Sequence, residues 1–410
     1  MDSLTQITLG AAIGEVTLGK KLGNRAMMWG AVAGTIPDLD VIANFFMDDM
    51  GALAFHRGFT HSIVFALLMP WLIGWLVWRL YESEHYKTKL HKILASIFGI
   101  LFLGFVVVIF NLIFRIALSG WNPVPILFSA GVSAFLIYRL WKNYLNKELD
   151  PIHVSYRDWV WFFFLTIITH PILDCFTAFG TQLFEPFSNY RVSWDNISVA
   201  DPMYTVWYIL FLVPTCFLLK TNKKRKTLAW LALSISGVYM IFTLFNKQNV
   251  SQIFEKSLAA NGIEADRYMT SPSILSNILW NGVAETDSAY YFSNYSLFDK
   301  KEEFINFHKI NKDYSMLDGH ENDRAIKILK WFSNGYFNIT KNSDENGDFW
   351  QLNDLRYGTR DGTFDESSDY IFKFKLIKKE NGEFDALDNG RPKDEEDMDF
   401  SPLFKRWRGI

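Results

Sequence analysis

Three short segments in the first half of the chain place histidine and aspartate beside strongly apolar sequence. They read Pro-Asp-Leu-Asp at residues 37–40, His-Arg-Gly-Phe-Thr-His-Ser at 56–62 and His-Pro-Ile-Leu-Asp at 170–174. Ionisable groups are costly in a membrane and usually remain there for a function. Because imidazole and carboxylate groups are ligands of zinc and similar divalent ions, these segments predict a metal site within a membrane protein.

The spacing within each segment indicates which side chains can share an ion. His170 and Asp174 are four residues apart, so on a helix they lie on one face, although hydrogen bonding inside a bundle would explain the pair equally well. Asp38 and Asp40 are two apart, which predicts one ligand and one capping or orienting group, although an irregular turn after Pro37 could present both as ligands. The predicted metal ligands are Asp38, Asp40, His56, His61, His170 and Asp174. Zinc is the expected ion, with manganese as the alternative.

Other polar residues are candidates for the chemistry itself. Arg57 is suited to hold an anionic substrate oxygen. A carboxylate that is not needed as a ligand could accept a proton from metal-activated water, and Asp40, Asp195 and Asp201 are the candidates. Asp201 precedes a proline, so it would equally suit the start of a helix. Glu15 could be a ligand, the partner of a basic residue or a helix-packing group.

The composition and the absence of known catalytic motifs narrow the possible partners, metal sites and nucleophiles. The chain has 410 residues, a net charge of -3 and only two cysteines. This charge does not favour nucleic acid as a partner, and two cysteines exclude a cysteine-rich zinc module. The apolar half contains no glycine-rich phosphate loop, nucleophile-elbow serine or HExxH motif. Metal-activated water is therefore the expected nucleophile.

Residues 1–246 are predicted to form a membrane-embedded domain of about eight helices. A bilayer core about 30 Å thick needs roughly 20 apolar residues of helix. Six clear apolar segments follow two weaker ones that are rich in glycine and alanine, as close helix packing requires. The predicted spans are 4–18, 26–46, 62–78, 93–118, 124–140, 159–179, 203–219 and 228–245.

Basic residues predict the orientation of these helices. Lysine and arginine concentrate in four connections, at residues 20–25, 79–92, 139–147 and 220–226. Such loops stay in the cytoplasm, so eight helices place the amino terminus and everything after residue 246 outside. The three histidine–aspartate segments then converge on the outer face of a cytoplasmic membrane.

The polar remainder, residues 247–410, is predicted to be a soluble, extracytoplasmic α+β domain. Helical periodicity covers residues 250–260 and 323–332, whereas residues 290–296, 337–340 and 370–377 have the composition of strands. An acidic run at residues 394–397 fits a solvated surface. The predicted fold is therefore mainly α, a helical membrane bundle followed by an α+β domain.

The motifs resemble the family of bacterial membrane-bound, metal-dependent hydrolases that includes the LexA-regulated YdjM-type proteins. The resemblance rests on the segments at 37–40, 56–62 and 170–174, with the following Gly-Thr at 180–181, and covers roughly residues 1–245. Members often carry histidine where this chain has Gln6, which removes one potential ligand. The resemblance implies an inner-membrane protein with hydrolase activity. The motif set is more distantly similar to zinc-dependent phospholipases C and related nucleases.

The leading hypothesis is a metal-dependent hydrolase that acts on a small or lipid-linked substrate, such as a phosphoester, at the outer membrane face. Membrane lipids are the expected surroundings. Two alternatives stay open. The same residues could form the pathway of an ion-binding transporter, in which the prolines at 37 and 171 would break helices. They could also hold a structural metal in a membrane scaffold without catalytic activity.

Overall fold

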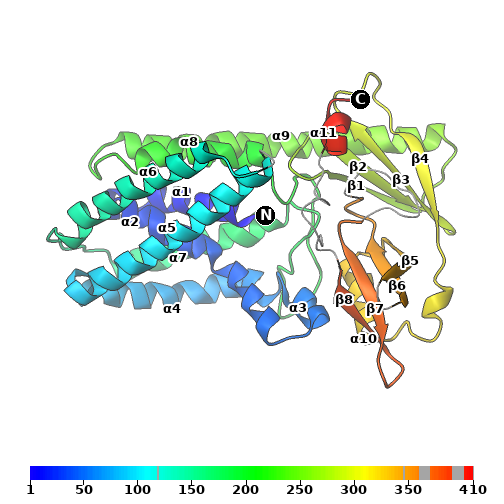
Figure 1. The fold of residues 1–410 in the computed structure, drawn as a ribbon, viewed down its shortest axis with the longest axis horizontal. Helices are drawn as coiled ribbons and strands as arrows, with labels where there is room; N and C mark the ends of the chain where they lie inside the picture. The colour runs from blue at the N-terminus through cyan, green and yellow to red at the C-terminus, as the bar shows by residue number, and fades with distance from the viewer. Residues whose placement is uncertain (118–119, 345–346, 360–369, 390–400, 410) are drawn as a thin grey trace. The chain divides into compact units, whose positions relative to one another are not determined.

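The structure is a computed structural model that describes residues 1–117, 120–344, 347–359, 370–389 and 401–409. It divides into two compact units, one formed by residues 1–70 with 162–410 and the other by residues 71–161. The predicted acidic run at 394–397 lies outside the described residues. Figure 1 labels the helices and strands of the two units.

Two helices joined by glycine contacts form the centre of the helical part of the first unit. α1 (Ser3–Leu22) and α2 (Asn24–Thr35) run side by side, and Asp2 caps α1 by accepting a hydrogen bond from the backbone of Thr5. A Cβ atom on Gly10 would lie 2.2 Å from the carbonyl oxygen of Gly30. The backbones touch because neither residue has a side chain, which is the close packing that the glycine-rich sequence predicts.

Two further helices complete this core. α8 (Pro202–Thr215) and α9 (Lys224–Ala260) pack against α1 around the buried rings of Tyr204 and Tyr208. Glu15 of α1 forms a buried, bidentate ion pair with Arg225 of α9, with N···O distances of 2.8 and 2.6 Å. Glu15 is therefore the partner of a basic residue.

The elements that carry the histidine and aspartate segments also belong to the first unit, wholly or in part. They are η1 (Pro37–Phe45), α3 (Asp49–Phe55), η2 (Phe59–His61), the beginning of α4 (Ile63–Glu82) and the end of α7 (Tyr156–Asp174). Pro37 follows the end of α2, and the chain continues as a 3-10 helix instead of the single long helix predicted for residues 26–46.

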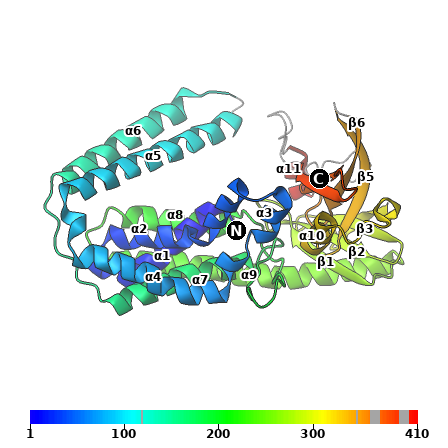
Figure 2. The same cartoon turned by 90° about the horizontal axis from the view of Figure 1, so that it is seen from below.

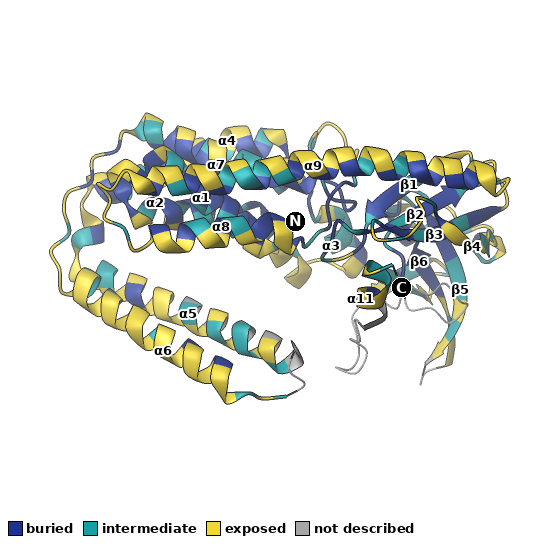
Figure 3. Cartoon of the chain, turned by 90° about the horizontal axis from the view of Figure 1, so that it is seen from above, coloured by how far each residue is buried: buried dark blue, intermediate teal, exposed yellow. Residues whose placement is uncertain are grey.

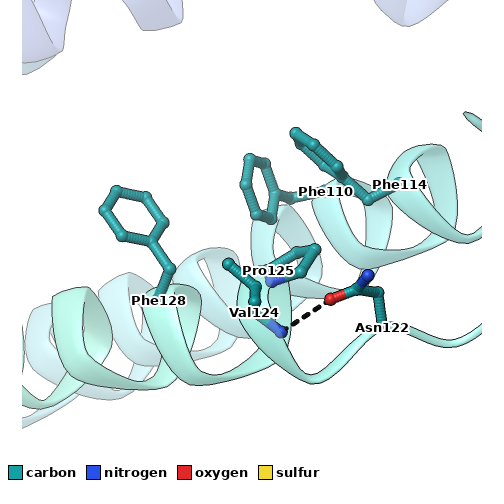
Figure 4. A pocket seen from close by; sticks show the side chains of 6 residues that line it. All are labelled: Phe110, Phe114, Asn122, Val124, Pro125 and Phe128. Atoms are coloured by element: carbon teal, nitrogen blue, oxygen red, sulfur yellow. Dashed lines mark hydrogen bonds between the residues drawn. The ribbon is translucent and has the colours of Figure 1, made fainter. Parts of the chain in front are cut away.

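The second unit contains a pair of apolar helices, α5 (Lys89–Ala117) and α6 (Pro123–Leu140), with short helices η3 (His85–Lys87) and η4 (Trp141–Leu145). The two helices run side by side (Figure 2), and most of their described residues are exposed (Figure 3). Near its tip, Phe110 and Phe114 of α5 and Phe128 of α6 line a shallow apolar pocket, where Asn122 caps α6 by accepting a hydrogen bond from the backbone of Val124 (Figure 4).

Helices are present at all eight predicted positions, but a bundle of eight membrane-spanning helices is not confirmed. Among the described residues, four helices are long and apolar enough to cross a membrane, and α8 is a shorter apolar helix. The four spans lie at Ile63–Glu82, Lys89–Leu112, Pro123–Leu145 and Lys224–Ala260. The others are too short or too polar, since α1 contains Glu15 and α2 has only 12 residues.

The carboxyl-terminal region is built on two antiparallel sheets. The first has the order β1-β2-β3-β4 and the second β5-β6-β7-β8. The strands are β1 (Arg267–Pro272), β2 (Leu279–Glu285), β3 (Ala289–Ser296), β4 (Ile305–Asn311), β5 (Phe337–Asp344), β6 (Gly347–Asp354), β7 (Lys373–Lys378) and β8 (Phe384–Asp388). Three short helices accompany them: η5 (Ser315–Leu317), α10 (Arg324–Phe332) and α11 (Ser401–Trp407).

α9 connects the apolar part of the first unit to these sheets without a break. Its last turns pack Val250, Phe254 and Leu258 against Trp280 and Phe304 of the first sheet region. The predicted boundary between residues 246 and 247 therefore falls inside a continuous helix. The second sheet and α10 enclose another core, to which Phe179 and Met50 also contribute.

Candidate metal centre

Each of the three histidine–aspartate segments lies where a helix begins or ends, and the fold brings these helix ends together. Asp38 lies in the first turn of η1, directly after Pro37. His61 is the last residue of η2, one residue before α4 begins, and His170 and Asp174 occupy the last two turns of α7. Side chains at element ends can therefore converge although His61 and His170 are 109 positions apart in the sequence.

Four of the predicted ligands meet in one group: Asp38, His61, His170 and Asp174. One donor atom from each residue lies within 4.8 Å of all the others. The two histidine Nε2 atoms are 3.1 Å apart, and they lie 3.4 and 3.2 Å from Oδ1 of Asp38. Oδ2 of Asp174 is 3.5 Å from each Nε2 atom.

These separations fit one small divalent ion. Donor atoms that surround zinc tetrahedrally at about 2.0–2.1 Å lie about 3.3–3.4 Å from one another. The five distances above, from 3.1 to 3.5 Å, scatter around that value. Two imidazoles and two carboxylates also form a donor set that suits zinc, and that manganese accepts.

Asp174 provides a second sign that a cation belongs here. Its Oδ1 atom accepts hydrogen bonds from the Gln6 amide, at 2.9 Å, and from the amino group of Met1. Its buried Oδ2 atom accepts no hydrogen bond, but it lies 3.2 Å from Nε of Arg57 and 3.5 Å from Nε2 of each histidine. A buried carboxylate oxygen that faces these nitrogens without an aligned hydrogen bond is suited to bind a metal ion. Gln6 thus contacts a ligand instead of acting as one.

Both histidines are oriented through their other ring nitrogen. Nδ1 of His170 donates to the carbonyl oxygen of Gly34 at 2.5 Å, so the lone pair of the neutral ring lies on Nε2. Nδ1 of His61 lies 3.5 Å from Oδ2 of Asp40 and 3.2 Å from the Thr60 hydroxyl. Outer contacts of this kind set the tautomer and direction of metal-binding histidines.

Asp40 and His56 lie beside the group of four, not within it. Buried Asp40 accepts a hydrogen bond from the Arg57 backbone at 2.8 Å, and its Oδ1 atom lies 3.0 Å from Nδ1 of His56. The His56 side chain keeps 32% of its surface exposed. The structure therefore assigns Asp40 an orienting position behind His61, and places His56 at the edge of the centre.

Arg57 reaches the centre from a left-handed backbone conformation, with φ of 56°. Its side chain is buried, with Nη1 donating to the Thr177 hydroxyl at 3.1 Å and Nε 3.2 Å from Oδ2 of Asp174. The guanidinium lies 4.6 Å from the centroid of the Phe179 ring. Arg57 therefore places a positive charge beside the predicted metal ligands.

The two remaining candidates are placed elsewhere. Asp201 caps α8, because its Oδ1 atom accepts from the backbone of Met203 at 2.9 Å and its Oδ2 atom accepts from the Tyr239 hydroxyl. Asp195 accepts from the Ser193 hydroxyl and is not part of the ligand group. Sequence reasoning missed the contributions of Gly34, Thr177 and Phe179, which carry no metal-binding side chain and therefore gave no signal.

Comparison with known proteins adds one match. The family model described as "YdjM inner membrane protein" matches residues 1–250, which include all four converging residues. No curated protein and no solved structure matches the chain. The two β-sheets lie beyond the matched region.

Proposed function

Because the chain belongs to the YdjM inner membrane protein family, and because four of its donor atoms fit one divalent ion, we propose that it is a membrane-bound, metal-dependent hydrolase. The observation that carries the proposal is the convergence of two histidine nitrogens and two aspartate oxygens at the spacing of a tetrahedral site. The basic connections support an orientation in which this centre and the carboxyl-terminal sheets lie outside the inner membrane.

A divalent ion, when bound, makes water acidic enough to supply hydroxide near neutral pH and neutralises negative charge on a reacting oxygen. Residues of the chain would bind the substrate and transfer the proton. Asp38, whose side chain is 21% exposed while the other ligand side chains are almost fully buried, faces the side from which substrate arrives. Arg57 would hold an anionic oxygen of the substrate, which favours a phosphoester.

His56 is the residue best placed to move a proton. Its Nδ1 atom is engaged by Asp40, which leaves Nε2 free to accept a proton from water or return it to a leaving oxygen. Asp40 would then connect proton transfer at His56 to the orientation of His61. In this assignment His56 takes the proton-accepting role that the sequence had suggested for Asp195 and Asp201. The side chains of Asp195 and Asp201 contact other groups.

Exposed apolar side chains on the segment that carries Asp38 support a lipid-linked substrate. Phe45 and Phe46, at the end of the 3-10 helix that carries Asp38, expose 84% and 83% of their surfaces. Exposed apolar patches of this kind mark membrane or ligand contacts. A headgroup at the metal centre would then be presented by a lipid that this segment touches.

The same four ligands also favour a second candidate, a structural metal. Catalytic zinc sites usually have three protein ligands and an open position, whereas four protein ligands are typical of structural sites. In that case the ion would only tie η1, η2 and α7 together.

A hydrolysis assay on the full chain in detergent separates the two functions. The protein loaded with zinc or manganese should hydrolyse a chromogenic phosphodiester, lose the activity with chelator and regain it with metal. Asp38→Asn and His61→Ala should be inactive, whereas His320→Ala, in the carboxyl-terminal region, should match the wild type. A metal-free variant that hydrolysed at the wild-type rate would exclude this mechanism. Tight metal binding without hydrolysis of any ester tested would favour the structural role.

A further inference from the structure

Arg191, in the connection between α7 and α8, holds a guanidinium without a counter-charge. The guanidinium lies 4.4 Å from the ring centroid of Phe179, 5.1 Å from that of Trp331 and 4.9 Å from that of Phe332. Its Nη2 atom donates to the carbonyl oxygen of Phe179, whereas Nε and Nη1 are buried and donate to no acceptor. Among the residues that the structure describes, no carboxylate forms an ion pair with Arg191.

Arg356 adds a second positive charge to the same group of rings. Its guanidinium lies 5.1 Å from the centroid of Phe332, the ring that also contacts Arg191. Arg356 has its own counter-charge, because its Nε and Nη2 atoms donate to Asp354 at 3.0 and 2.6 Å. Burial and the nearby charge of Arg356 lower the pKa of Arg191 to about 9. An anion beside Arg191 would oppose both effects.

The surrounding rings offset only part of the cost of burying the Arg191 charge. An aromatic face attracts a cation, but it does not accept the hydrogen bonds that Nε and Nη1 can donate. Buried donors without acceptors are rare in folded proteins. An anion would supply both the acceptors and the missing charge, and hydrogen bonds between two charged groups are the strongest kind. The unfilled donors of Arg191 therefore point to an anionic ligand.

A further unfilled donor indicates an oxyanion with several acceptor atoms. The hydroxyl of Tyr357 is buried without a hydrogen-bond partner, and the ring of Tyr357 lies 5.2 Å from the Arg356 guanidinium. A phosphate group carries three or more acceptor oxygens and up to two negative charges near neutral pH, so it can satisfy several donors at once. A carboxylate has fewer acceptor positions and a single charge.

Trp331 lies between Arg191 and the solvent. Trp331 is only partly buried, and its Nε1 atom donates to the carbonyl oxygen of Asn189 at the surface, at 3.1 Å. Arg191 is also partly exposed as a whole, although its Nε and Nη1 atoms are buried. Rotation of the Trp331 indole would therefore admit an ion from the solvent without a route through the metal centre.

We propose that Arg191, together with Arg356 and Tyr357, forms a binding site for a phosphate group that is separate from the metal centre. The site goes beyond the proposed hydrolase function, because it requires neither the metal ligands nor turnover. It joins residue 191, within the family match, to residues 356 and 357, which lie beyond that match. The phosphate comes from solution or from a lipid headgroup, since both present the same oxyanion.

Calorimetry with inorganic phosphate on the full, metal-loaded chain tests this site. Arg191→Gln should weaken phosphate binding here about 10–100-fold, the loss expected for one or two charge-assisted hydrogen bonds. Arg191→Lys should lose less, because lysine keeps the charge but not the planar set of donors. Arg267→Gln is the matched control: Arg267 also contacts a ring, that of Tyr336 at 4.1 Å, but it pairs with Glu285.

His61→Ala distinguishes this site from the metal centre, where phosphate could also bind. The variant should lose the metal and keep the phosphate binding that depends on Arg191. Affinity that Arg191→Gln leaves unchanged, or phosphate binding that disappears entirely in His61→Ala, would overturn the proposal. Phosphate binding at Arg191 without any hydrolysis would support the site and refute the hydrolase. Hydrolysis without phosphate binding at Arg191 would do the reverse.

The Trp331 indole gives a second measurement that does not depend on His61→Ala. Phosphate should change the tryptophan fluorescence of the wild type, and Trp331→Phe, which keeps an aromatic ring over Arg191, should remove most of this change. Equal changes in both proteins would contradict the site. Competition with soluble dihexanoyl phosphatidic acid then identifies the source: stronger binding than inorganic phosphate supports a lipid headgroup, and weaker binding supports free phosphate.

Discussion

Nε2 of His61 and Nε2 of His170 face each other at 3.1 Å in a buried site. The carbonyl oxygen of Gly34 accepts a hydrogen bond from Nδ1 of His170, and Oδ2 of Asp40 lies 3.5 Å from Nδ1 of His61. A separation of 3.1 Å suits a hydrogen bond between the two Nε2 atoms when one of them carries a proton, and a metal ion bound by both nitrogens would replace that proton.

The purified chain should contain about one equivalent of zinc or manganese, because structural and catalytic ions of this type are held by deprotonated ligands in the folded state. His61→Ala and His170→Ala should each lose the ion, measured by elemental mass spectrometry. His320→Ala should keep it, since His320 is bonded to Asp323 in the carboxyl-terminal region. Full metal content in either ligand variant would contradict the assigned site.

Asp40→Asn should weaken metal binding about 10–100-fold, the usual effect of removing an outer partner of a metal-bound histidine. The variant keeps the shape of the side chain but loses the charge that faces His61 and His56. A competition titration with a metal-binding dye measures the change. Asp201→Asn is the control, because asparagine can still cap α8 and Asp201 is not one of the four ligands. Equal losses in both variants would argue for a general effect on folding.

Gly30→Ala should destabilise the α1–α2 pair by about 1–3 kcal/mol, the range for an overpacked contact. Its Cβ atom would lie 2.1 Å from the backbone oxygen of Gly10, so the helices must separate. Because α2 also presents the Gly34 carbonyl to His170, metal affinity should fall together with thermal stability. Gly237→Ala on α9 meets no atom within 4 Å and should not destabilise the protein. A loss of thermal stability of similar size in both variants would contradict the close contact between α1 and α2.

Glu15→Gln should cost about 3–5 kcal/mol of unfolding free energy, because it leaves the guanidinium of Arg225 buried without its counter-charge. Both side chains of the pair are only 2% exposed. Denaturant unfolding in detergent measures the change. Metal content of the folded fraction should remain normal, since Glu15 is not one of the four ligands. Loss of the ion at full stability would instead connect Glu15 to the site.

The ion pair between Asp48 and Arg324 predicts a modest dependence of stability on pH. The hydrogen bond from Arg324 lowers the pKa of Asp48 to about 2. The stabilisation is therefore present above the unfolded value of about 3.9 and is lost as the pH falls toward 2. Both groups are largely exposed, so the pair contributes at most about 1 kcal/mol.

Variants of Asp48 separate this ion pair from helix capping. Asp48 also caps α3 by accepting from the backbone of Gly51 at 2.8 Å. Asp48→Asn should keep the cap but lose the ion pair with Arg324, and with it the pH dependence between about pH 4 and pH 2. Asp48→Ala should lose a further ~1 kcal/mol. Melting temperatures of the two variants across this pH range would show whether the effects separate.

The sequence alone identified the candidate metal ligands and the family. His61, His170, Asp38 and Asp174 stand out because ionisable groups are rare beside apolar segments, and their motifs are specific enough to indicate the family that the match over residues 1–250 then confirmed. Helices at the eight apolar positions and the strands near residues 290, 337 and 373 also follow from local periodicity. These features depend on neighbouring residues and can therefore be inferred without the fold.

Only the tertiary structure decided which residues meet. Asp40 resembles Asp38 in sequence, yet it lies behind His61, because the 3-10 helix after Pro37 turns the two carboxylates toward different partners. Asp201 became a helix cap, and Arg225 paired with Glu15 across 210 positions. The contact of Arg191 and Arg356 with one ring, that of Phe332, had no sequence signal at all. Contacts between distant segments depend on how whole elements pack, and no local pattern contains that information.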